Sequence, residues 1–240
     1  MFTHLLPALI RTPLEAWLNR RSFMLSQVGQ DVWVFGEVFN EKRGGYFLDI
    51  GAHDGVTNSN TLLLETRYHW NGLCVEANPI MFERLRGSRR VHCINACLDD
   101  SEREVNFYQK GVRGGIIDAG LDNQDVSIDD ERVTRLRTRT LASVLDEFGA
   151  PDVIDYLSID TEGAEERILG HFDFDRYVFR CITIERPSDT LRQLLRDKGY
   201  SLVKEVPQFD CFYVHESFAH EYRQNLFTFF KKRQFAFRWK

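Results

Sequence analysis

The sequence predicts an α/β fold in which a mostly parallel sheet carries helices on both faces. Five short apolar runs alternate with segments that carry helix formers and helix caps, which is the pattern of strand–helix–strand units. The first run leads directly into a turn that contains two glycines. Two further apolar runs, separated only by a short turn, close the core and must pair antiparallel. At 240 residues, 43% of them hydrophobic, the chain can form one such domain with additional segments at its ends.

Composition and charge narrow the classes of function. The formal net charge is -5, whereas nucleic-acid binding usually requires a basic surface, so we expect no nucleic-acid partner. No apolar run has membrane-spanning length and the N-terminus lacks a convincing cleavage site, so we expect a cytoplasmic protein. The cysteines are odd in number and form no C-x-x-C pair, which favours buried free thiols in a reducing compartment. They are Cys74, Cys93, Cys97, Cys181 and Cys211.

Residues 46–55, with the sequence YFLDIGAHDG, predict a buried strand that ends in a glycine turn and leads into a helix. This is the first half of a nucleotide-binding α/β unit, in which glycines let a ligand approach the backbone. The turn differs from the dinucleotide motif G-x-G-x-x-G, because Asp49 precedes Gly51 and His53 separates the glycines. An acid suits a cationic group better than a phosphate, and S-adenosylmethionine carries a sulfonium and an ammonium. The motif alone is weak, and an accidental turn stays open as the alternative.

A second buried strand, residues 72–76, ends in Glu76, which lies 21 residues beyond Gly55. In nucleotide-binding α/β folds an acid at this position accepts hydrogen bonds from the two hydroxyls of a ribose. Asn78 follows as a predicted helix cap and Pro79 as the first helical residue. We therefore expect Glu76 to bind a ribose, and a solvated glutamate at the strand end is the alternative.

The next part of the chain predicts a third strand, a short edge strand and a long loop. The third strand is residues 91–98, and Ala96 and Cys97 near its end are expected to border an adenine ring. Residues 105–108 predict the edge strand. Residues 109–135 carry several glycines and aspartates, which is typical of either a mobile lid or a solvated surface, and both interpretations stay open.

Two later strands end in acids at the same edge of the predicted sheet. Asp160 ends the fourth strand, Glu162 follows it, and Glu185 ends the fifth. The helix dipole favours acids in the first turn of a helix, but that explanation does not cover Asp160, which ends a strand. The elements predicted here are a helix at residues 140–148, strands at 154–160 and 181–185, a helix capped by Ser188, and a hairpin of residues 200–206 and 211–216.

The two ends of the chain differ from this core. Residues 1–43 carry apolar residues at helical spacing and predict one or two helices that pack on the core or on a second subunit. Residues 217–240 interleave aromatic and basic residues. This tail suits an anionic membrane surface or a partner, and packing of its aromatic rings on the body or across a dimer is the alternative.

Four phrases of the sequence together resemble the FkbM-type methyltransferases: FLDIGAHDG, WNGLCVEANP, TRTLASVLDE and IDYLSIDTEGAE. The resemblance covers residues 26–216 and implies a Rossmann-like class I methyltransferase fold with a seven-stranded sheet. It also implies S-adenosylmethionine as the cofactor and methyl transfer to a hydroxyl, typically of a sugar or natural-product scaffold. We therefore divide the chain into an N-terminal helical extension (1–43), a methyltransferase domain (44–216) and a basic aromatic tail (217–240).

The resemblance also implies roles for single residues. The turn formed by Asp49, Gly51 and Gly55 would lie under the methionine part of the cofactor, and Glu76 would bind its ribose. Asp160 would face the gap between cofactor and acceptor, and it is the first candidate for the base that removes the hydroxyl proton, ahead of Glu162, Glu185 and His53. The residues expected to bind the cofactor are Asp49, Gly51, Ala52, His53, Asp54, Gly55, Ser59, Asn60, Glu76, Ala77, Asn78, Ala96, Cys97 and Asp160.

The sequence also leads to expectations about a metal, about partners and about alternative functions. Acids at strand ends would permit a divalent metal, but the sequence has no fixed ligand spacing and we do not favour one. The expected partner is a small-molecule or glycan acceptor, while peripheral membrane contact through the tail and a homodimer stay open. The alternative function is a catalytically inactive cofactor-binding or scaffolding module that its tail recruits to a partner or a membrane. A nicotinamide dehydrogenase is not expected, because the G-x-G-x-x-G turn is absent.

Overall fold

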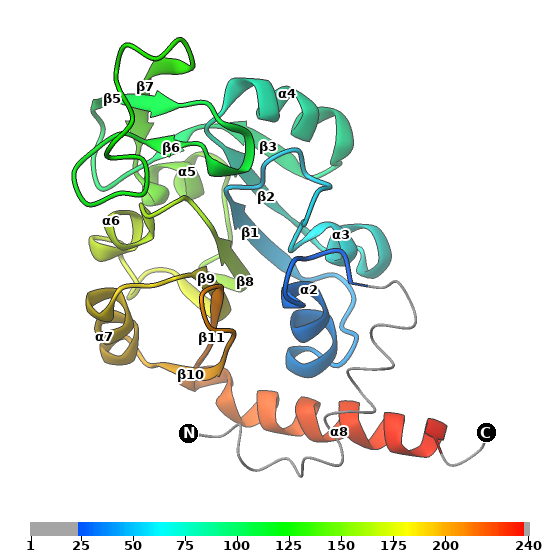
Figure 1. The fold of residues 1–240 in the computed structure, drawn as a ribbon. Helices are drawn as coiled ribbons and strands as arrows, with labels where there is room; N and C mark the ends of the chain where they lie inside the picture. Colours follow the sequence, from blue (N-terminus) through cyan, green and yellow to red (C-terminus); the bar gives the residue numbers. More distant parts are fainter. Residues whose placement is uncertain (1–23, 238–240) are drawn as a thin grey trace.

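A seven-stranded sheet forms the centre of the molecule (Figure 1). The computed structural model describes residues 24–237, and the helices predicted within residues 1–23 lie outside this part. The strand order is β10-β11-β9-β8-β1-β2-β3. The strands are β1 (Tyr46–Ile50), β2 (Asn71–Glu76), β3 (His92–Asn95), β8 (Val153–Ile159), β9 (Val178–Glu185), β10 (Tyr200–Glu205) and β11 (Asp210–His215).

The direction of the strands confirms a mostly parallel sheet with a closing antiparallel hairpin. β1 pairs parallel with β2 and β8, and the outer pairs β2–β3 and β8–β9 are also parallel. Only β11 runs against its neighbours, β9 and β10. The chain moves outward from β1 to β3 and then returns to β8 on the other side of β1. The carboxyl ends of β1 and β8 therefore border the crevice where open α/β sheets bind ligands.

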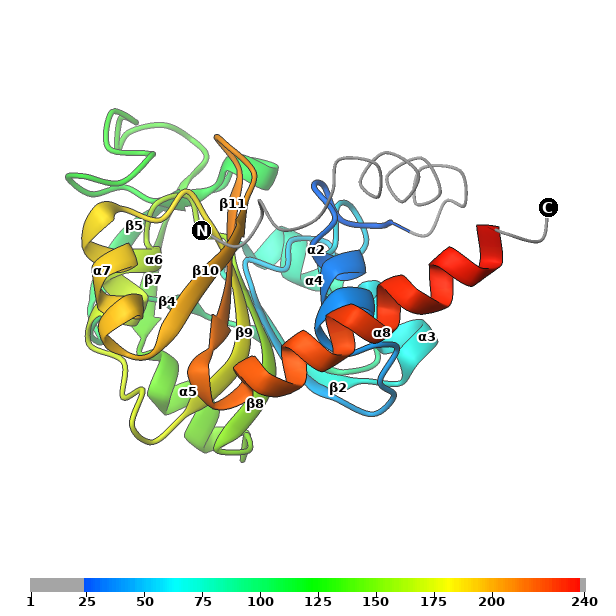
Figure 2. The same ribbon diagram turned by 90° about the horizontal axis from the view of Figure 1, so that it is seen from below.

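Helices cover both faces of the sheet, as predicted (Figure 2). One face packs on residues of α5, α6 and α7, and the other packs on α2, η2, α3, α4 and the start of the C-terminal segment. The helices on the first face are α5 (Leu141–Glu147), α6 (Glu165–Gly170) and α7 (Asp189–Asp197). Those on the second are α2 (Gln30–Val32), the π-helix η2 (Trp33–Val38), α3 (Leu62–Tyr68), α4 (Pro79–Ser88) and, after the short 3-10 turn η4 (Glu216–Phe218), α8 (Ala219–Phe237).

Both ends of the described chain pack on the same face. The ring of Trp33 lies 5.0 Å from that of Phe212 on β11, at right angles to it. Phe229 of α8 is fully buried, and a Cβ on Gly36 would lie only 2.4 Å from its ring. At least this aromatic residue of the tail packs back on the body. The division at residues 43 and 217, and contact of the tail with a membrane or a partner, stay predictions.

A second, four-stranded sheet corrects three expectations for residues 91–139. The third predicted strand is divided, because the chain leaves the central sheet at Ala96 and the Asn95 amide donates to the carbonyls of Glu76 and Ala77. β5 is not an edge strand, since β6 and β7 flank it. The predicted loop also contains β6 and the start of β7. These elements, here called the insertion, are β4 (Cys97–Leu98), β5 (Glu104–Tyr108), the 3-10 turn η3 (Gly111–Arg113), β6 (Gly115–Ile116) and β7 (Val133–Arg139).

The structure also bears on the cysteines and on membrane-spanning helices. All five cysteines are free, and four of them are buried, while Cys93 is half-buried. None of the helices within residues 24–237 combines the length and apolar character needed to cross a bilayer. The cellular compartment stays a prediction.

Candidate functional site

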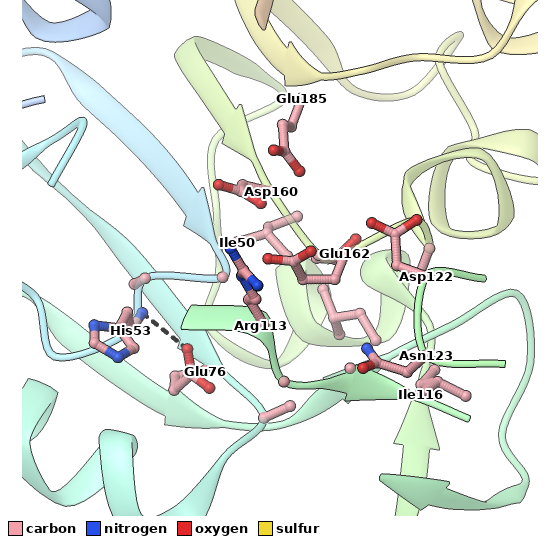
Figure 3. A pocket seen from close by; sticks show the side chains of 18 of the residues that line it. Ile50, His53, Glu76, Arg113, Ile116, Asp122, Asn123, Asp160, Glu162 and Glu185 are labelled. Carbon is pink, nitrogen blue, oxygen red and sulfur yellow. Dashed lines mark hydrogen bonds between the residues drawn. The ribbon is translucent and has the colours of Figure 1, made fainter. Parts of the chain in front are cut away.

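A cavity of about 980 Å³ lies between the carboxyl ends of the central strands and the insertion (Figure 3). Its wall joins the turns after β1, β2 and β8 to the segment between β5 and residue 126. The predicted site residues in this wall are Asp49, Gly51, Ala52, His53, Ser59, Asn60, Glu76, Ala77, Ala96, Cys97, Asp160, Glu162 and Glu185. Three predicted cofactor residues, Asp54, Gly55 and Asn78, are not part of the wall.

The turn after β1 needs a glycine at Gly51 for a reason that the sequence did not give. Gly51 has φ +82, and a Cβ there would lie 1.8 Å from the backbone oxygen of Asp160. The backbone N–H groups of Gly51 and Ala52 both donate to the carbonyl of Val75, at 3.0 and 3.1 Å. Gly51 therefore lets the ends of β1, β2 and β8 come together, and it borders the cavity as a result.

The three predicted residues outside the wall have structural roles in the turn after β1 and at the start of α4. A Cβ on Gly55 would lie 2.7 Å from side-chain atoms of Arg89, Leu85 and Ser88, so this glycine permits close packing on α4. Asp54 accepts hydrogen bonds from the backbone N–H groups of residues 56 and 57 and from the Thr57 hydroxyl. Asn78 caps α4, as predicted. Direct contact of these three with a cofactor stays a prediction.

Glu76 holds two turns together with its carboxylate. Oε2 accepts from the backbone N–H of His53 at 2.8 Å, and Oε1 accepts from that of Asn78 at 2.7 Å. Burial raises the pKa of Glu76 to about 6, although these two hydrogen bonds act in the opposite direction. Each carboxylate oxygen has a second lone pair, and the residue borders the cavity. Glu76 can thus accept further hydrogen bonds from ligand hydroxyls without losing its contacts to the turns.

Asp49 lies deeper and is almost fully buried. Its Oδ2 accepts from the Thr61 hydroxyl at 2.5 Å, and the guanidinium of Arg89 lies 4.0 Å away. Burial raises the pKa of Asp49, while Arg89 and the hydroxyls of Thr61 and Ser158 lower it. Ser158 also accepts from the Asn60 amide at 2.9 Å. Asp49 therefore joins the end of β1 to the end of β8 and to the start of α3.

Arg89 is a site-supporting residue that the sequence reasoning missed. Its guanidinium is fully buried and pairs with the buried carboxylate of Glu65. It also donates to the Thr61 hydroxyl at 2.9 Å and to the carbonyl of Gly55 at 3.3 Å. No sequence signal distinguishes Arg89 from the other arginines near the end of α4, because its burial depends on how α4 packs against the turn.

Three of the four predicted catalytic residues meet at one end of the cavity. One carboxylate oxygen each of Asp160, Glu162 and Glu185 lies within 4.8 Å of the others. Asp160 is exposed to solvent inside the cavity, but protein atoms surround it closely and remove much of its hydration. This desolvation raises its pKa, and so do the negative charges of the neighbouring Glu185, Glu165 and Glu162. Burial and the Glu185 charge likewise raise the pKa of Glu162 to about 7. This group can share and accept protons near neutral pH.

The same three carboxylates have a spacing that would suit a divalent cation. Hard cations such as Mg²⁺ prefer carboxylate oxygens. Arg186 already supplies positive charge, since its guanidinium lies 2.9 Å from Glu185, 2.6 Å from Asp122 and 3.5 Å from Glu162. A proton shared among the acids would relieve the remaining repulsion equally well. The expectation that the protein holds no metal therefore stays a prediction.

His53 lies apart from the three carboxylates, on the Glu76 side of the cavity (Figure 3). Its φ is +51, and its backbone N–H faces Glu76. The ring nitrogen Nδ1 is buried, lies 3.6 Å from Asp54 and has no hydrogen-bond partner among the residues described. The structure thus does not bring His53 together with the other catalytic candidates, and a catalytic role for it stays a prediction.

Further wall residues come from the N-terminal segment and from residues 109–135, and none of them was singled out as a site residue from the sequence. Gln27 and Gln30 reach the cavity from the N-terminal segment, and Gln30 donates to the buried Asp210 of β11 at 2.8 Å. Arg113 and Asn123 come from the insertion. The sequence KGVRGG at residues 110–115 was a usable signal, because a glycine-rich segment lets the backbone approach a ligand or another chain segment.

Comparisons with known proteins give a match to one family model and similarities to solved structures. The family model described as the methyltransferase FkbM domain matches residues 49–202. No curated protein matches the chain. Among solved structures, it is similar to a TehB-like SAM-dependent methyltransferase from Corynebacterium glutamicum, at 11% identity over 88% of this chain and 100% of that chain, with a TM-score of 0.43. It is also similar to the METTL16 methyltransferase domain, at 14% identity over 89% and 99% of the two chains, with a TM-score of 0.43.

The family match extends from Asp49 through Glu76 and Asp160 into β10. It thus includes the three acids at the ends of β1, β2 and β8, and it covers more than half of the chain. This protein belongs to the FkbM methyltransferase family, a family of S-adenosylmethionine-dependent enzymes.

Proposed function

We propose that this protein transfers a methyl group from S-adenosylmethionine to a hydroxyl of a small-molecule or glycan acceptor. The observation that carries the proposal is that one cavity has an acid suited to bind a ribose at one end and a group of three acids suited to accept a proton at the other. Glu76 borders it after β2, where it can accept from ribose hydroxyls. Asp160, Glu162 and Glu185 gather at the other end, where the pKa of Glu162 is raised to about 7.

The wall of the cavity fits the cofactor in its chemistry. Carboxylates outnumber basic groups there, which suits a ligand with a sulfonium and an ammonium. The close approach of Gly51 to Asp160 leaves no room for a Cβ between the turn and the end of β8. When bound, S-adenosylmethionine supplies an electrophilic methyl group on sulfur. Among the expected cofactor residues, Asp49 and Glu76 are held in place by hydrogen bonds from the protein itself.

The acid group supplies what an alcohol acceptor requires. A hydroxyl is a weak nucleophile, and a base that removes its proton during attack increases the rate. Burial and the charges of the neighbouring acids raise the pKa of Asp160, which makes its ionised carboxylate a stronger base toward that proton. We assign this step to Asp160, and we assign to Glu162 and Glu185 the role of keeping its pKa high. The acceptor oxygen must also lie in line with the bond that breaks, which the wall residues would enforce.

Replacement of Asp160 by asparagine tests the proposal. We expect turnover, measured as formation of S-adenosylhomocysteine with a panel of hydroxylated acceptors, to fall by about a hundredfold to ten-thousandfold. Binding of S-adenosylhomocysteine should stay within about threefold of the wild type, because the base is not needed for binding. Glu83→Gln, at an exposed position of α4, is the matched control. Loss of S-adenosylhomocysteine binding in the Asp160 variant would instead make Asp160 a cofactor residue.

A further inference from the structure

The wall of the cavity contains a cation that the proposed reaction has not used. Lys110, Arg113 and Arg186 are its lysine and arginine residues. Arg186 is paired with carboxylates, and the Lys110 ammonium stands 5.9 Å from the ring centre of Tyr108. Within residues 24–237, the Arg113 side chain forms no hydrogen bond or ion pair. Figure 3 shows it extending from the insertion into the space that Glu76, Asp160 and Glu162 surround.

The backbone around Arg113 is held by specific contacts. Its N–H donates to the carbonyl of Lys110 at 2.9 Å, which closes the turn η3. With its amide oriented to satisfy both neighbours, the buried Asn123 donates to the carbonyl of Arg113 and accepts from the N–H of Gly115, each at 3.2 Å. A Cβ on Gly115 would lie 3.3 Å from Cβ of Glu162, so the insertion packs tightly against the acid end of the cavity. These contacts hold the backbone of Arg113 at the cavity, and its exposed side chain forms part of the wall.

The charge around Arg113 indicates what it can bind. The cavity has many carboxylates, so an anionic ligand group would be repelled from most of its wall. Arg113 is suited to overcome that repulsion, because the planar fork of a guanidinium binds carboxylate and phosphate with two parallel hydrogen bonds, whereas the ammonium of Lys110 acts as a point charge. We propose that Arg113 binds an anionic group, a carboxylate or a phosphate, of a ligand that occupies this cavity.

Two sources of that anion are compatible with the site, and the inference rests on the proposed function. The amino-acid part of the cofactor carries a carboxylate. The acceptor can also carry a carboxylate or phosphate, as sugar acids and phosphorylated sugars do. In either case Arg113 adds selectivity, because a ligand without the anion would leave the guanidinium unpaired.

Calorimetric titrations of the full-length protein can distinguish the two sources. The probes are S-adenosylhomocysteine, 5′-methylthioadenosine, which lacks the amino-acid carboxylate, and inorganic phosphate. Phosphate is titrated into both the free protein and the protein saturated with S-adenosylhomocysteine. The variants are Arg113→Gln and, as a matched control, Arg135→Gln on β7, which removes the same charge outside the cavity wall.

A cofactor carboxylate at Arg113 predicts that Arg113→Gln weakens S-adenosylhomocysteine about tenfold to a hundredfold and leaves methylthioadenosine unchanged. An acceptor anion predicts unchanged binding of both nucleosides and loss of phosphate binding to the saturated protein. The proposal would be overturned if Arg113→Gln bound S-adenosylhomocysteine as tightly as the wild type does, and if phosphate binding were either absent from both proteins or equal in the two. A wild type that binds neither nucleoside would contradict the proposed function, while phosphate binding to the free protein still decides the role of Arg113.

Discussion

The carboxylate of Glu76 accepts a hydrogen bond from the backbone N–H of His53, across 2.8 Å and 23 positions of sequence. The same carboxylate accepts from the backbone of Asn78. One side chain therefore fixes the turn after β1 against the turn after β2. It also borders the cavity, so the geometry of the turns and the proposed binding of a ribose depend on the same two oxygens.

Replacement of Glu76 by glutamine should weaken S-adenosylhomocysteine binding about tenfold to a hundredfold. The amide keeps the size of the side chain but has a single acceptor oxygen, so its NH₂ group must face one of the two backbone donors. Isothermal titration calorimetry measures the change, and the exposed Glu83→Gln serves as control. Wild-type affinity in Glu76→Gln would exclude Glu76 as the residue that binds the ribose.

Replacement of Arg89 by methionine should lower the free energy of unfolding by about 3 to 5 kcal/mol. Methionine fills similar space, but the buried carboxylate of Glu65 loses its partner, and Asp49 loses a nearby positive charge. Urea denaturation measures the change. The same substitution at Arg86, whose side chain is 65% exposed, should cost less than about 1 kcal/mol.

A second variant tests whether Arg89→Met lowers the stability through the unpaired buried charge of Glu65 or through loss of packing. If the unpaired Glu65 causes the instability, the double variant Arg89→Met with Glu65→Met should recover part of the lost stability. A double variant that is less stable than Arg89→Met alone would show that packing, and not the unpaired carboxylate, is the cause.

The rate of methyl transfer should rise with pH through a step above the usual range of an aspartate, because Asp160 must be ionised to accept the proton. The position follows from the burial of Asp160 and from the charges of Glu185, Glu165 and Glu162, which all raise its pKa. Glu162→Gln removes one of the like charges that raise the pKa of Asp160. The step in kcat/KM should therefore move to lower pH, and a step that does not move would contradict the coupling.

Glu162→Gln should also be more stable than the wild type at pH 8, by about 1 to 2 kcal/mol. Because the pKa of Glu162 is raised from 4.5 to about 7 by folding, the native state binds more protons than the unfolded state in that interval. The stability of the wild type consequently falls as the pH rises through the interval, whereas glutamine does not titrate. Thermal unfolding of both proteins at pH 4 and pH 8 measures the effect, and the difference should vanish at pH 4.

The central sheet could be predicted from the sequence because each of its strands has a local signal. Buried parallel strands are continuous apolar runs, and β1, β2, β8 and β9 of this chain carry an acid at or next to their ends, which the fold then places at one edge. Asn78 and Pro79 mark the start of α4 directly in the sequence, and the structure confirms that Asn78 caps it. The meeting of Asp160, Glu162 and Glu185 follows from the same rule, since neighbouring parallel strands end side by side.

The insertion and the supporting residues could not be predicted, because their signals are not local. β7 has the sequence VTRLRTR, which lacks a run of apolar residues, and it forms a strand through its pairing with β5. Arg89 is buried only because α4 packs against the turn that contains Gly55. Gln30 reaches the cavity through its contact with Asp210, 180 positions away. Each of these depends on tertiary packing rather than on local sequence.

Calorimetric titration of the full-length protein with S-adenosylhomocysteine, with NADH as the control ligand, is the most direct test of the assigned site. The arrangement of Asp49, Gly51 and Glu76 predicts micromolar binding of S-adenosylhomocysteine and no binding of NADH, because the turn after β1 offers an acid where a dinucleotide needs a diphosphate site. Binding of NADH alone, or of neither ligand, would contradict the assignment of this cavity to S-adenosylmethionine.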